Sequence, residues 1–163
     1  MKKQKYLYIW GDRMKILLCS DSHTDLKYFY EVIKKENPEL IIFAGDHSID
    51  AIEMSYAVDI PFHIVKGNCD YNDYETKETL ELEIESMGKV ILTHGHLFGV
   101  KSNMNSIYKY GVEKNANYVI FGHTHKQHKS EYRDIVFINP GAIINHEYAT
   151  IENGILEFKG EMI

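Results

Sequence analysis

Apolar residues along the chain gather in short, unbroken runs, and most runs stop at a polar residue beside a glycine. Six runs have this form, and they begin at Lys15, Leu40, Phe62, Lys89, Tyr118 and Asp134. Continuous apolar runs of this length, bounded by turn residues, are typical of β-strands that are buried on both faces. The pattern therefore predicts a sheet at the centre of the molecule.

Stretches with helical character separate several of these runs. Residues 25–36 begin beside two candidate capping residues, Thr24 and Asp25, and end before Pro38. Further helices are expected over residues 50–58 and 102–114, the second weakened by Gly111. Strands that alternate with helices predict a largely parallel sheet with helical crossovers.

Two other segments predict antiparallel pairing. Residues 80–86 alternate apolar and polar side chains and then turn at Met87 and Gly88 into the next run. Near the C-terminus, residues 148–151 and 155–158 flank an Asn-Gly pair, which is a strong hairpin signal. We therefore expect an α/β (α+β) fold, a four-layer αββα sandwich in which two mixed β-sheets are flanked by helices.

The length of 163 residues fits one domain, 1–163, and is enough to bury a proper core. Residues 1–13 are expected to form an N-terminal extension, because the sequence from Met14 would itself make a natural start. Their apolar stretch is too short for a signal peptide. No run is long enough to cross a bilayer, and two cysteines do not make a disulfide framework. These features predict a cytoplasmic protein that does not associate with membranes.

Residues with metal-binding chemistry stand where the apolar runs end. Imidazoles, carboxylates and one amide occur there, from five different runs: Asp21 and His23, Asp46, Asn68 with Asp70, His94 and His96, and His123 and His125. Functional groups gather at the carboxyl ends of strands in open α/β folds. Imidazole with carboxylate suits Mn, Fe, Ni or Zn.

Each of these short motifs is weak on its own. A lone histidine is more often a hydrogen-bonded structural residue than a ligand, and a single Gly-Asp pair occurs by accident in many proteins. Five such motifs at five successive strand ends are much harder to obtain by chance. On an extended backbone, Asp21 and His23 would also point the same way and could chelate one ion.

The ordered series Asp21-Ser-His23, Gly45-Asp46, Gly67-Asn68-Cys-Asp70, His94-Gly-His96 and Gly122-His123-Thr-His125 resembles the calcineurin-like metallophosphoesterase superfamily. The compact length and the Asn139-Pro140-Gly141 segment resemble its small prokaryotic phosphodiesterase branch. The resemblance implies an αββα fold and two metal ions. It assigns Asp21, His23 and His125 to one ion, Asn68, His94 and His123 to the other, and Asp46 to both. Spacing alone would place His123 and His125 on the same ion.

The expected cofactor is a pair of divalent ions, with manganese expected first and Ni, Zn or Fe as alternatives. Two such ions lower the pKa of a shared water, so that hydroxide can attack phosphorus near neutral pH. Their charge exceeds that of Asp21, Asp46 and hydroxide together, which favours an anionic substrate. The sequence thus predicts a hydrolase of small phosphate esters, with diesters expected first.

Position 69 departs from the wider family. Many members carry a histidine after the Gly-Asn pair, and this histidine is thought to assist the leaving group. This chain has Cys69 at that position. A thiol is mostly neutral at pH 7 and is a poor match for imidazole in acid–base work. Three readings follow: a preference for diesters with good leaving groups, a proton supplied by His96, or a buried cysteine with no role.

Other functions compete with that of a phosphodiesterase. The same fold occurs in a retromer subunit that has lost ligands and acts as a protein-interaction scaffold, and a phosphomonoesterase is a further alternative. A nuclease of long nucleic acid would need an extended basic groove, and the formal net charge of -6 argues against one. Self-association is left open.

Overall fold

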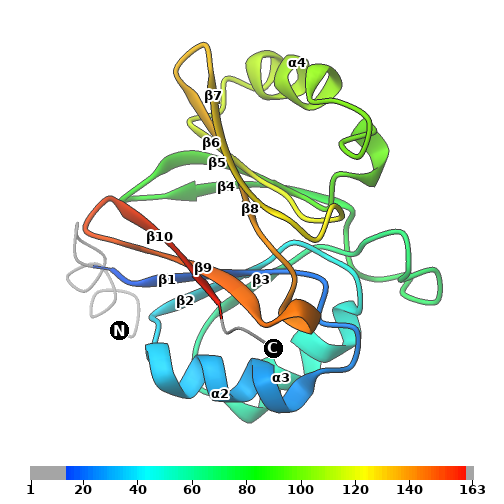
Figure 1. The fold of residues 1–163 in the computed structure, drawn as a ribbon, viewed down its shortest axis with the longest axis vertical. Coiled ribbons are helices and arrows are strands. Elements are labelled where there is room, and N and C mark those ends of the chain that lie inside the picture. The colour runs from blue at the N-terminus through cyan, green and yellow to red at the C-terminus, as the bar shows by residue number, and fades with distance from the viewer. Residues whose placement is uncertain (1–13, 161–163) are drawn as a thin grey trace, which may run out of the picture.

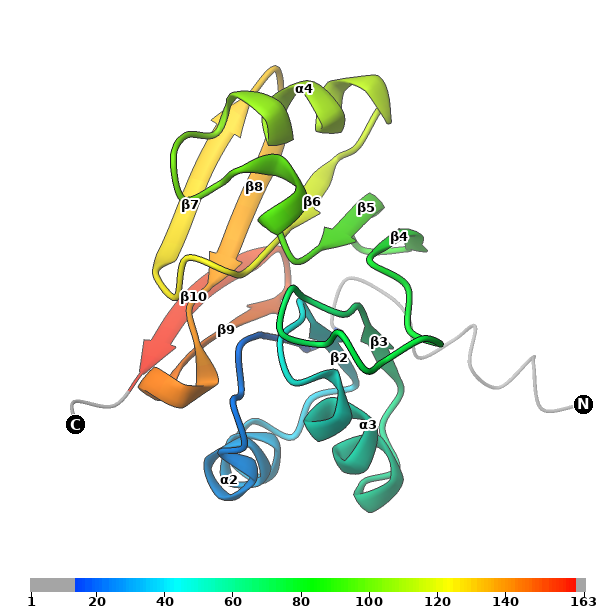
Figure 2. The ribbon, with the colours of Figure 1, turned by 90° about the vertical axis from the view of Figure 1, so that its right-hand side faces the viewer.

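The computed structural model describes residues 14–160. Two five-stranded sheets pack face to face, and helices cover the outer face of each, which gives four layers (Figures 1 and 2). The predicted αββα sandwich is confirmed. The predicted extension, residues 1–13, lies outside the described residues.

The first sheet joins three parallel strands to a C-terminal hairpin. Its strands are β1 (Ile16–Cys19), β2 (Leu40–Phe43), β3 (Phe62–Ile64), β9 (Glu147–Glu152) and β10 (Ile155–Gly160), in the order β10-β9-β1-β2-β3. Strand β9 runs antiparallel to both β1 and β10. Helices α2 (Leu26–Glu36) and α3 (Ser48–Ala57) lie against its outer face (Figure 1).

The second sheet is also mixed. Its strands are β4 (Thr79–Ile84), β5 (Gly88–Thr93), β6 (Tyr118–Ile120), β7 (Gln127–Tyr132) and β8 (Ile135–Pro140), in the order β4-β5-β6-β8-β7. Strands β5, β6 and β8 are parallel. Helix α4 (Asn105–Glu113) covers its outer face, and the short 3-10 helices η1 (His96–Phe98) and η2 (Ile143–Asn145) follow β5 and β8.

The unbroken apolar runs are explained by burial on both faces of each sheet. In β1, Ile16 and Leu18 face the core between the two sheets, whereas Leu17 and Cys19 pack against Phe29 and its neighbours under α2 and α3. A third cluster fills the space between the second sheet and α4. Cys19 is therefore a core-packing residue, as its place within an apolar run predicts.

Element boundaries differ from the predictions in a few places. Helix α3 begins at Ser48 rather than at residue 50, and α4 begins at Asn105 rather than at residue 102. The start of α2 agrees, because the side chain of Asp25 caps it by accepting a hydrogen bond from the Tyr28 backbone N–H. Strand β7 was not predicted, because its sequence QHKSEY carries no apolar pattern and its side chains are not buried.

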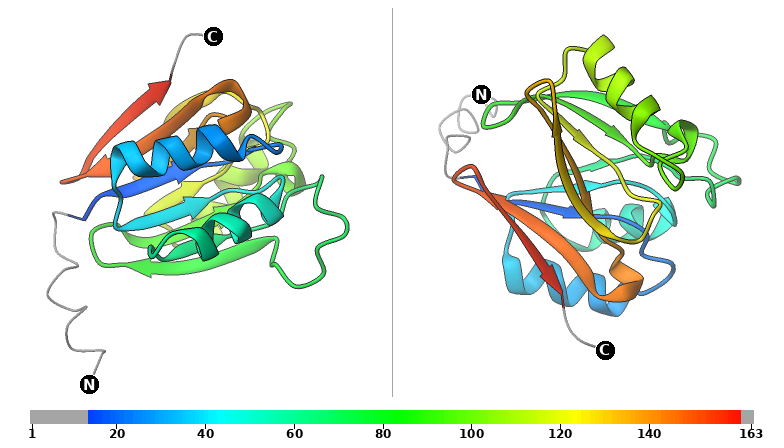
Figure 3. Two further views of the ribbon diagram at one scale, coloured as in Figure 1. Left: turned by 90° about the horizontal axis from the view of Figure 1, so that it is seen from below. Right: turned by 45° about the horizontal axis from the view of Figure 1, so that its top comes forward.

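The topology brings the carboxyl ends of five strands together at one side of the sandwich. Strands β1, β2 and β3 are parallel neighbours in one sheet, and β5 and β6 are parallel neighbours in the other (Figure 3). Backbone hydrogen bonds join the ends: Asp21 N donates to Gly45 O at 2.8 Å, and Gly122 N donates to His94 O at 2.9 Å. Within residues 14–160, no helix is both long and apolar enough to cross a membrane.

Candidate metal centre

Six of the predicted ligand residues lie in two adjoining groups at these strand ends. Asp21, His23, Asp46 and His125 form the first group, and Asp46, His94 and His123 form the second, with the possible ligand atoms of each group within 4.8 Å of one another. Asp46 belongs to both groups. The structure thus separates His123 from His125, which spacing alone did not do.

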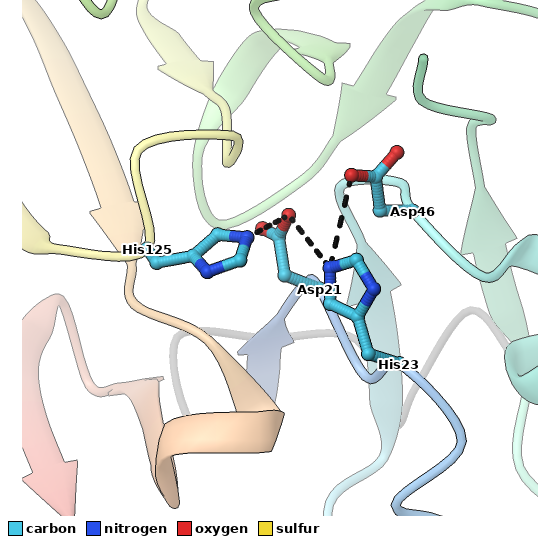
Figure 4. Close-up of side chains that lie close together, drawn as sticks. All are labelled: Asp21, His23, Asp46 and His125. Carbon is cyan, nitrogen blue, oxygen red and sulfur yellow. Dashed lines mark ion pairs between the residues drawn. The ribbon is translucent and has the colours of Figure 1, made fainter. Parts of the chain in front are cut away.

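The first group surrounds the carboxylate of Asp21. The Nε2 atom of His125 lies 3.1 Å from Asp21 Oδ1, and His23 Nε2 lies 3.9 Å from the same oxygen (Figure 4). His23 Nε2 also lies 3.8 Å from Oδ2 of Asp46, which reaches in from the end of β2. Side chains from both sheets therefore face one point.

The second group adjoins the same oxygen of Asp46 as the first. His94 Nε2 is 3.3 Å from Asp46 Oδ2 and 3.8 Å from Asp21 Oδ1. The rings of His94 and His123 meet edge to face, with their centroids 5.0 Å apart. His94 is fully buried, so its imidazole is held between the sheets.

The backbone at the site is left-handed rather than extended. Five of the six residues have positive φ angles between 42° and 71°: Asp21, His23, Asp46, His123 and His125. Asp21 and His23 do face one point, as predicted, but the extended backbone from which this was predicted is wrong. Tight left-handed turns after β1, β2 and β6 direct these side chains inward instead.

Two glycines leave room for the carboxylates. A Cβ atom on Gly67 would overlap Asp46 Oδ1 and would lie 2.8 Å from His94 Cδ2. A Cβ atom on Gly122 would lie 2.7 Å from Asp21 Oδ2. Any side chain at either position would displace a carboxylate, which is the physical reason for glycine beside these motifs.

Hydrogen bonds hold one oxygen of each carboxylate and leave its other oxygen available to bind a cation. Ser20 Oγ and the backbone N–H of His123 both donate to Asp21 Oδ2, and the Cys69 N–H donates to Asp46 Oδ1 at 2.9 Å. His94 Nδ1 lies 2.7 Å from the carbonyl oxygen of Ala44. Since a carbonyl only accepts, Nδ1 carries the proton and the lone pair of Nε2 faces the site.

The charge states of the two carboxylates and of His123 suit cation binding. Burial opposes ionisation of Asp21 and Asp46, but the neighbouring histidines outweigh it and lower both pKa values, that of Asp46 to about 2. Burial together with the charge of His94 lowers the pKa of His123 to about 4, so its ring is neutral at pH 7. Burial also disfavours charge on His94, but the nearby carboxylates of Asp46 and Asp21 raise its pKa overall, so a cation that binds there must displace a proton from the ring.

Several buried atoms at the site have no hydrogen-bond partner. They are Asp21 Oδ1, His23 Nε2 and His94 Nε2. Buried polar atoms are nearly always paired, and a carboxylate oxygen beside two imidazole nitrogens is a donor set for a divalent transition-metal ion. The residues present therefore fit a metal.

The other predicted site residues border the two groups. Asn68 and Cys69 are exposed in the loop that follows β3. The backbone N–H of Cys69 in this loop donates to Asp46. The interpretation of Cys69 as a buried residue is wrong. The ring of His96 lies 5.5 Å from that of His94, and burial followed by the charge of His94 lowers the pKa of His96. Both side-chain oxygens of buried Asp70 accept backbone N–H bonds, from Gly67 and Ser48.

Sequence reasoning missed three residues that position the centre. Ser20 braces Asp21, and its hydroxyl also reaches the carbonyl oxygen of Gly141. Asp50 accepts hydrogen bonds from Ser22 Oγ and Thr24 N, which holds the turn that carries His23. Asn139 Nδ2 donates to the Gly122 carbonyl oxygen ahead of His123. Of the three, only Asn139 belongs to a recognisable sequence motif; no pattern in the sequence pointed to Ser20 or Asp50 as positioning residues.

The sequence matches a family model over residues 14–160, that of the calcineurin-like phosphoesterase superfamily domain. The probable metallophosphoesterase YsnB of Bacillus subtilis is 34% identical over 132 residues, which are 80% of this chain and 75% of that protein. A phosphodiesterase of Methanocaldococcus jannaschii is 29% identical over 161 residues, 88% of this chain and 93% of that one.

Solved structures show the same fold. An archaeal phosphodiesterase superposes with a TM-score of 0.71 at 24% identity, covering 91% of this chain and all of that one (100%). Vps29 of Chaetomium thermophilum superposes with a TM-score of 0.74 at 14% identity, covering 93% of this chain and 96% of that one. Vps29 of Entamoeba histolytica, complexed with Zn²⁺, has a TM-score of 0.70 at 19% identity, covering 90% and 97%.

Proposed function

The chain belongs to the calcineurin-like phosphoesterase superfamily, and from that premise we propose that it is a phosphodiesterase that uses two divalent metal ions. The observation that carries the proposal is the position of Asp46. Its carboxylate is common to both ligand groups, as a bridge between two neighbouring ions requires. Manganese is the proposed ion, with Ni, Zn or Fe as alternatives.

The proposal gives each ligand residue a place. Asp21, His23 and His125 would hold one ion together with Asp46. His94 and His123 would hold the other with Asp46, and Asn68 would complete it from the adjacent loop. Asn68 brings an oxygen without charge, so it leaves more of the cations' positive charge for a phosphate anion.

Two bound divalent ions would supply a water of lowered pKa as nucleophile and positive charge for the phosphoryl oxygens. The chain's own residues supply the frame. Asp46 is oriented by the Cys69 N–H, Asp21 by Ser20 and the His123 N–H, and His94 by the Ala44 carbonyl. Such preorganisation keeps the ligands in place when substrate binds.

The residues around the centre favour diesters with good leaving groups. Although Cys69 is exposed as a residue, partial desolvation of its thiol and the neighbouring carboxylate of Asp46 raise its pKa to about 11, so the thiol is a weak proton donor. A proton donor matters most when the leaving group is a poor one. His96 stays the alternative donor, although its lowered pKa favours the neutral ring at pH 7.

A protein-interaction scaffold is the competing function, because Vps29 proteins share the fold. Metal content alone does not separate the two functions, since one Vps29 structure is a zinc complex. Hydrolysis does separate them. The proposed substrate is a small phosphate ester; long nucleic acids and membranes are not proposed as partners, and self-association stays an open prediction.

The deciding experiment measures hydrolysis of bis(p-nitrophenyl) phosphate and p-nitrophenyl phosphate with Mn²⁺, Ni²⁺, Zn²⁺ or Fe²⁺. Wild type should hydrolyse the diester faster than the monoester, and Asp46→Asn should lose at least about 100-fold in kcat/KM because a bridging ligand is weakened. Asp59→Asn, the same change at an exposed position, is the matched control and should retain full activity. Equal rates for wild type and Asp46→Asn would refute the assignment.

A further inference from the structure

A pocket of about 630 Å³ opens beside the candidate metal centre. We call it the tyrosine pocket; its walls include Ile49 and Ile52 of α3, and Tyr71 and Tyr74 of the loop between β3 and β4. That loop lies over the start of α3 (Figure 2). The predicted ligands themselves do not line it.

The tyrosine pocket adjoins the centre through two residues. Cys69 lines the pocket, and its backbone N–H holds Asp46 Oδ1. His47 lines it too, and its ring lies 4.8 Å from that of His23. A phosphodiester held at the metal centre would therefore place one of its two ester groups at the mouth of this pocket.

The lining presents large apolar surface to solvent. Tyr71 is 77% exposed, Tyr74 is 87% exposed and Ile49 is 56% exposed. Clusters of exposed apolar side chains beside polar groups are typical of binding sites, and tyrosine rings stack well on planar heterocycles.

The loop that carries the tyrosines is held in place. Asp73 Oδ2 accepts a hydrogen bond from Ser48 Oγ at 2.7 Å, and Asp73 Oδ1 accepts the backbone N–H groups of Glu75 and Thr76. Lys66 Nζ donates to the Asp73 carbonyl oxygen at 2.7 Å. The pocket is thus formed before a ligand arrives, which lowers the entropic cost of binding.

The charge of the pocket selects against a second anion. Among the described residues, its lining contains no lysine or arginine, and it includes Asp70, Asp73 and Glu75. A polyphosphate or a carboxylate would be repelled there. A neutral planar group with polar edges fits better, because the tyrosine rings offer faces and the pocket's rim offers hydrogen-bonding side chains.

We propose that the tyrosine pocket binds the base of a nucleoside ester, so that the substrate is a nucleotide diester with the base between Tyr71, Tyr74 and Ile49. This inference rests on the proposed function, because it needs the phosphate at the metal centre. Each stacked base contributes on the order of 1–3 kcal/mol, which corresponds to an effect of roughly 5- to 150-fold on kcat/KM.

The test compares two diesters with the same leaving group, thymidine 5′-(p-nitrophenyl) phosphate and methyl p-nitrophenyl phosphate. Wild type should prefer the nucleoside ester about tenfold or more in kcat/KM. Tyr74→Ala and Tyr71→Ala should each lower that preference several-fold. Tyr56→Ala is the matched control, because Tyr56 is also 87% exposed and does not line the pocket; the preference should persist in it.

The outcomes separate the inference from the proposed function. Hydrolysis of both esters without a preference, or a preference that survives both tyrosine variants, overturns the inference alone. Hydrolysis of neither ester overturns the proposed function. In that case, binding of thymidine by calorimetry still decides the inference: binding that Tyr74→Ala weakens and Tyr56→Ala does not supports the pocket, and no binding overturns it.

Discussion

At the scale of single residues, the centre is built on unusual backbone. Left-handed φ angles at Asp21, His23, Asp46, His123 and His125 are costly for residues with a Cβ atom, by about 1–2 kcal/mol each. Such conformations persist where the surrounding structure enforces them, and they cluster at functional sites. The identity of these residues was readable in the sequence, but their left-handed conformation was not, because only a few per cent of non-glycine residues adopt it.

Gly67 gives a direct test of the crowding at the site. In Gly67→Ala the added methyl group would overlap Asp46 Oδ1, so Asp46 must move. We expect metal affinity to fall by about 10-fold or more, and stability to fall by about 1–3 kcal/mol. Calorimetric titration with Mn²⁺ and chemical denaturation measure the two effects.

Gly154→Ala is the matched control for Gly67→Ala. Gly154 has a φ angle of 73° and no neighbouring atom within 4 Å of an added Cβ. It should therefore cost about 1–2 kcal/mol through backbone strain while metal affinity stays unchanged. Unaltered metal affinity in Gly67→Ala would show that Asp46 is not a ligand.

The residue at position 69 should determine whether the leaving group receives a proton. Cys69→His would place an imidazole where the thiol, with a pKa of about 11, donates poorly. General acids contribute about 10²-fold or more when well placed, so we expect about a tenfold gain or more in kcat/KM on alkyl diesters. Cys69→Gln is the control, because glutamine is similar in size to histidine but has no titrating group; it should give no gain in kcat/KM. No gain in Cys69→His, with metal still bound, would remove the hypothesis.

At the scale of elements, the strands were easier to predict than the helix boundaries. Strands β1, β2, β5 and β8 are buried on both faces, so their apolar runs are continuous and conspicuous. Strand β7 at the sheet edge has no buried side chain to give it a pattern. Helix α3 starts earlier than predicted because Asp70 and Asp73, distant in sequence, bind the backbone and side chain of Ser48.

Glu36 connects four elements and should make stability depend on pH. Its side chain is 4% exposed at the end of α2 and contacts Lys15, Tyr148 and Lys159, which flank or lie on β1, β9 and β10. Burial opposes ionisation, but these three partners lower the pKa of Glu36 to about 2. The carboxylate therefore stabilises the fold above about pH 4.5, and this contribution is lost as the pH falls towards 2.

Glu36→Gln should lower the free energy of unfolding by about 2 kcal/mol at pH 7, because Lys15 and Lys159 lose their buried partner and keep only the exposed Glu152 and Glu157. The difference from wild type should shrink steadily between about pH 4.5 and pH 2. Glu31→Gln is the control, since exposed Glu31 only approaches Lys27 at 4.0 Å. Urea denaturation across this range measures both; a difference that does not vary with pH would contradict the account.

At the scale of the whole molecule, the centre joins the two sheets. Asp21, His23 and Asp46 follow strands of the first sheet, whereas His94, His123 and His125 follow strands of the second. Each ligand group draws on both sheets. Six of the seven predicted ligand residues meet there, because parallel strands carry their carboxyl ends to one side; Asn68 stays a prediction. The division of His123 from His125 depends on turns that spacing does not encode, and the resemblance to the family anticipated it.

The tyrosine pocket shows the limit of sequence reasoning at this scale. Tyr71 and Tyr74 lie in a loop without apolar periodicity, and only the fold reveals that this loop is tied to α3 and adjoins Asp46. Chemistry that depends on strand ends can be read from motifs. A surface assembled from a loop and a helix of different strand crossovers has no comparable signal.

We propose that this chain holds two metal ions between its sheets, with Asp46 shared. Anomalous diffraction from crystals grown with Mn²⁺ would locate both ions. Two manganese peaks per chain are expected, one within Asp21, His23, Asp46 and His125 and the other within Asp46, His94 and His123. A single peak, peaks elsewhere, or none would contradict the proposal.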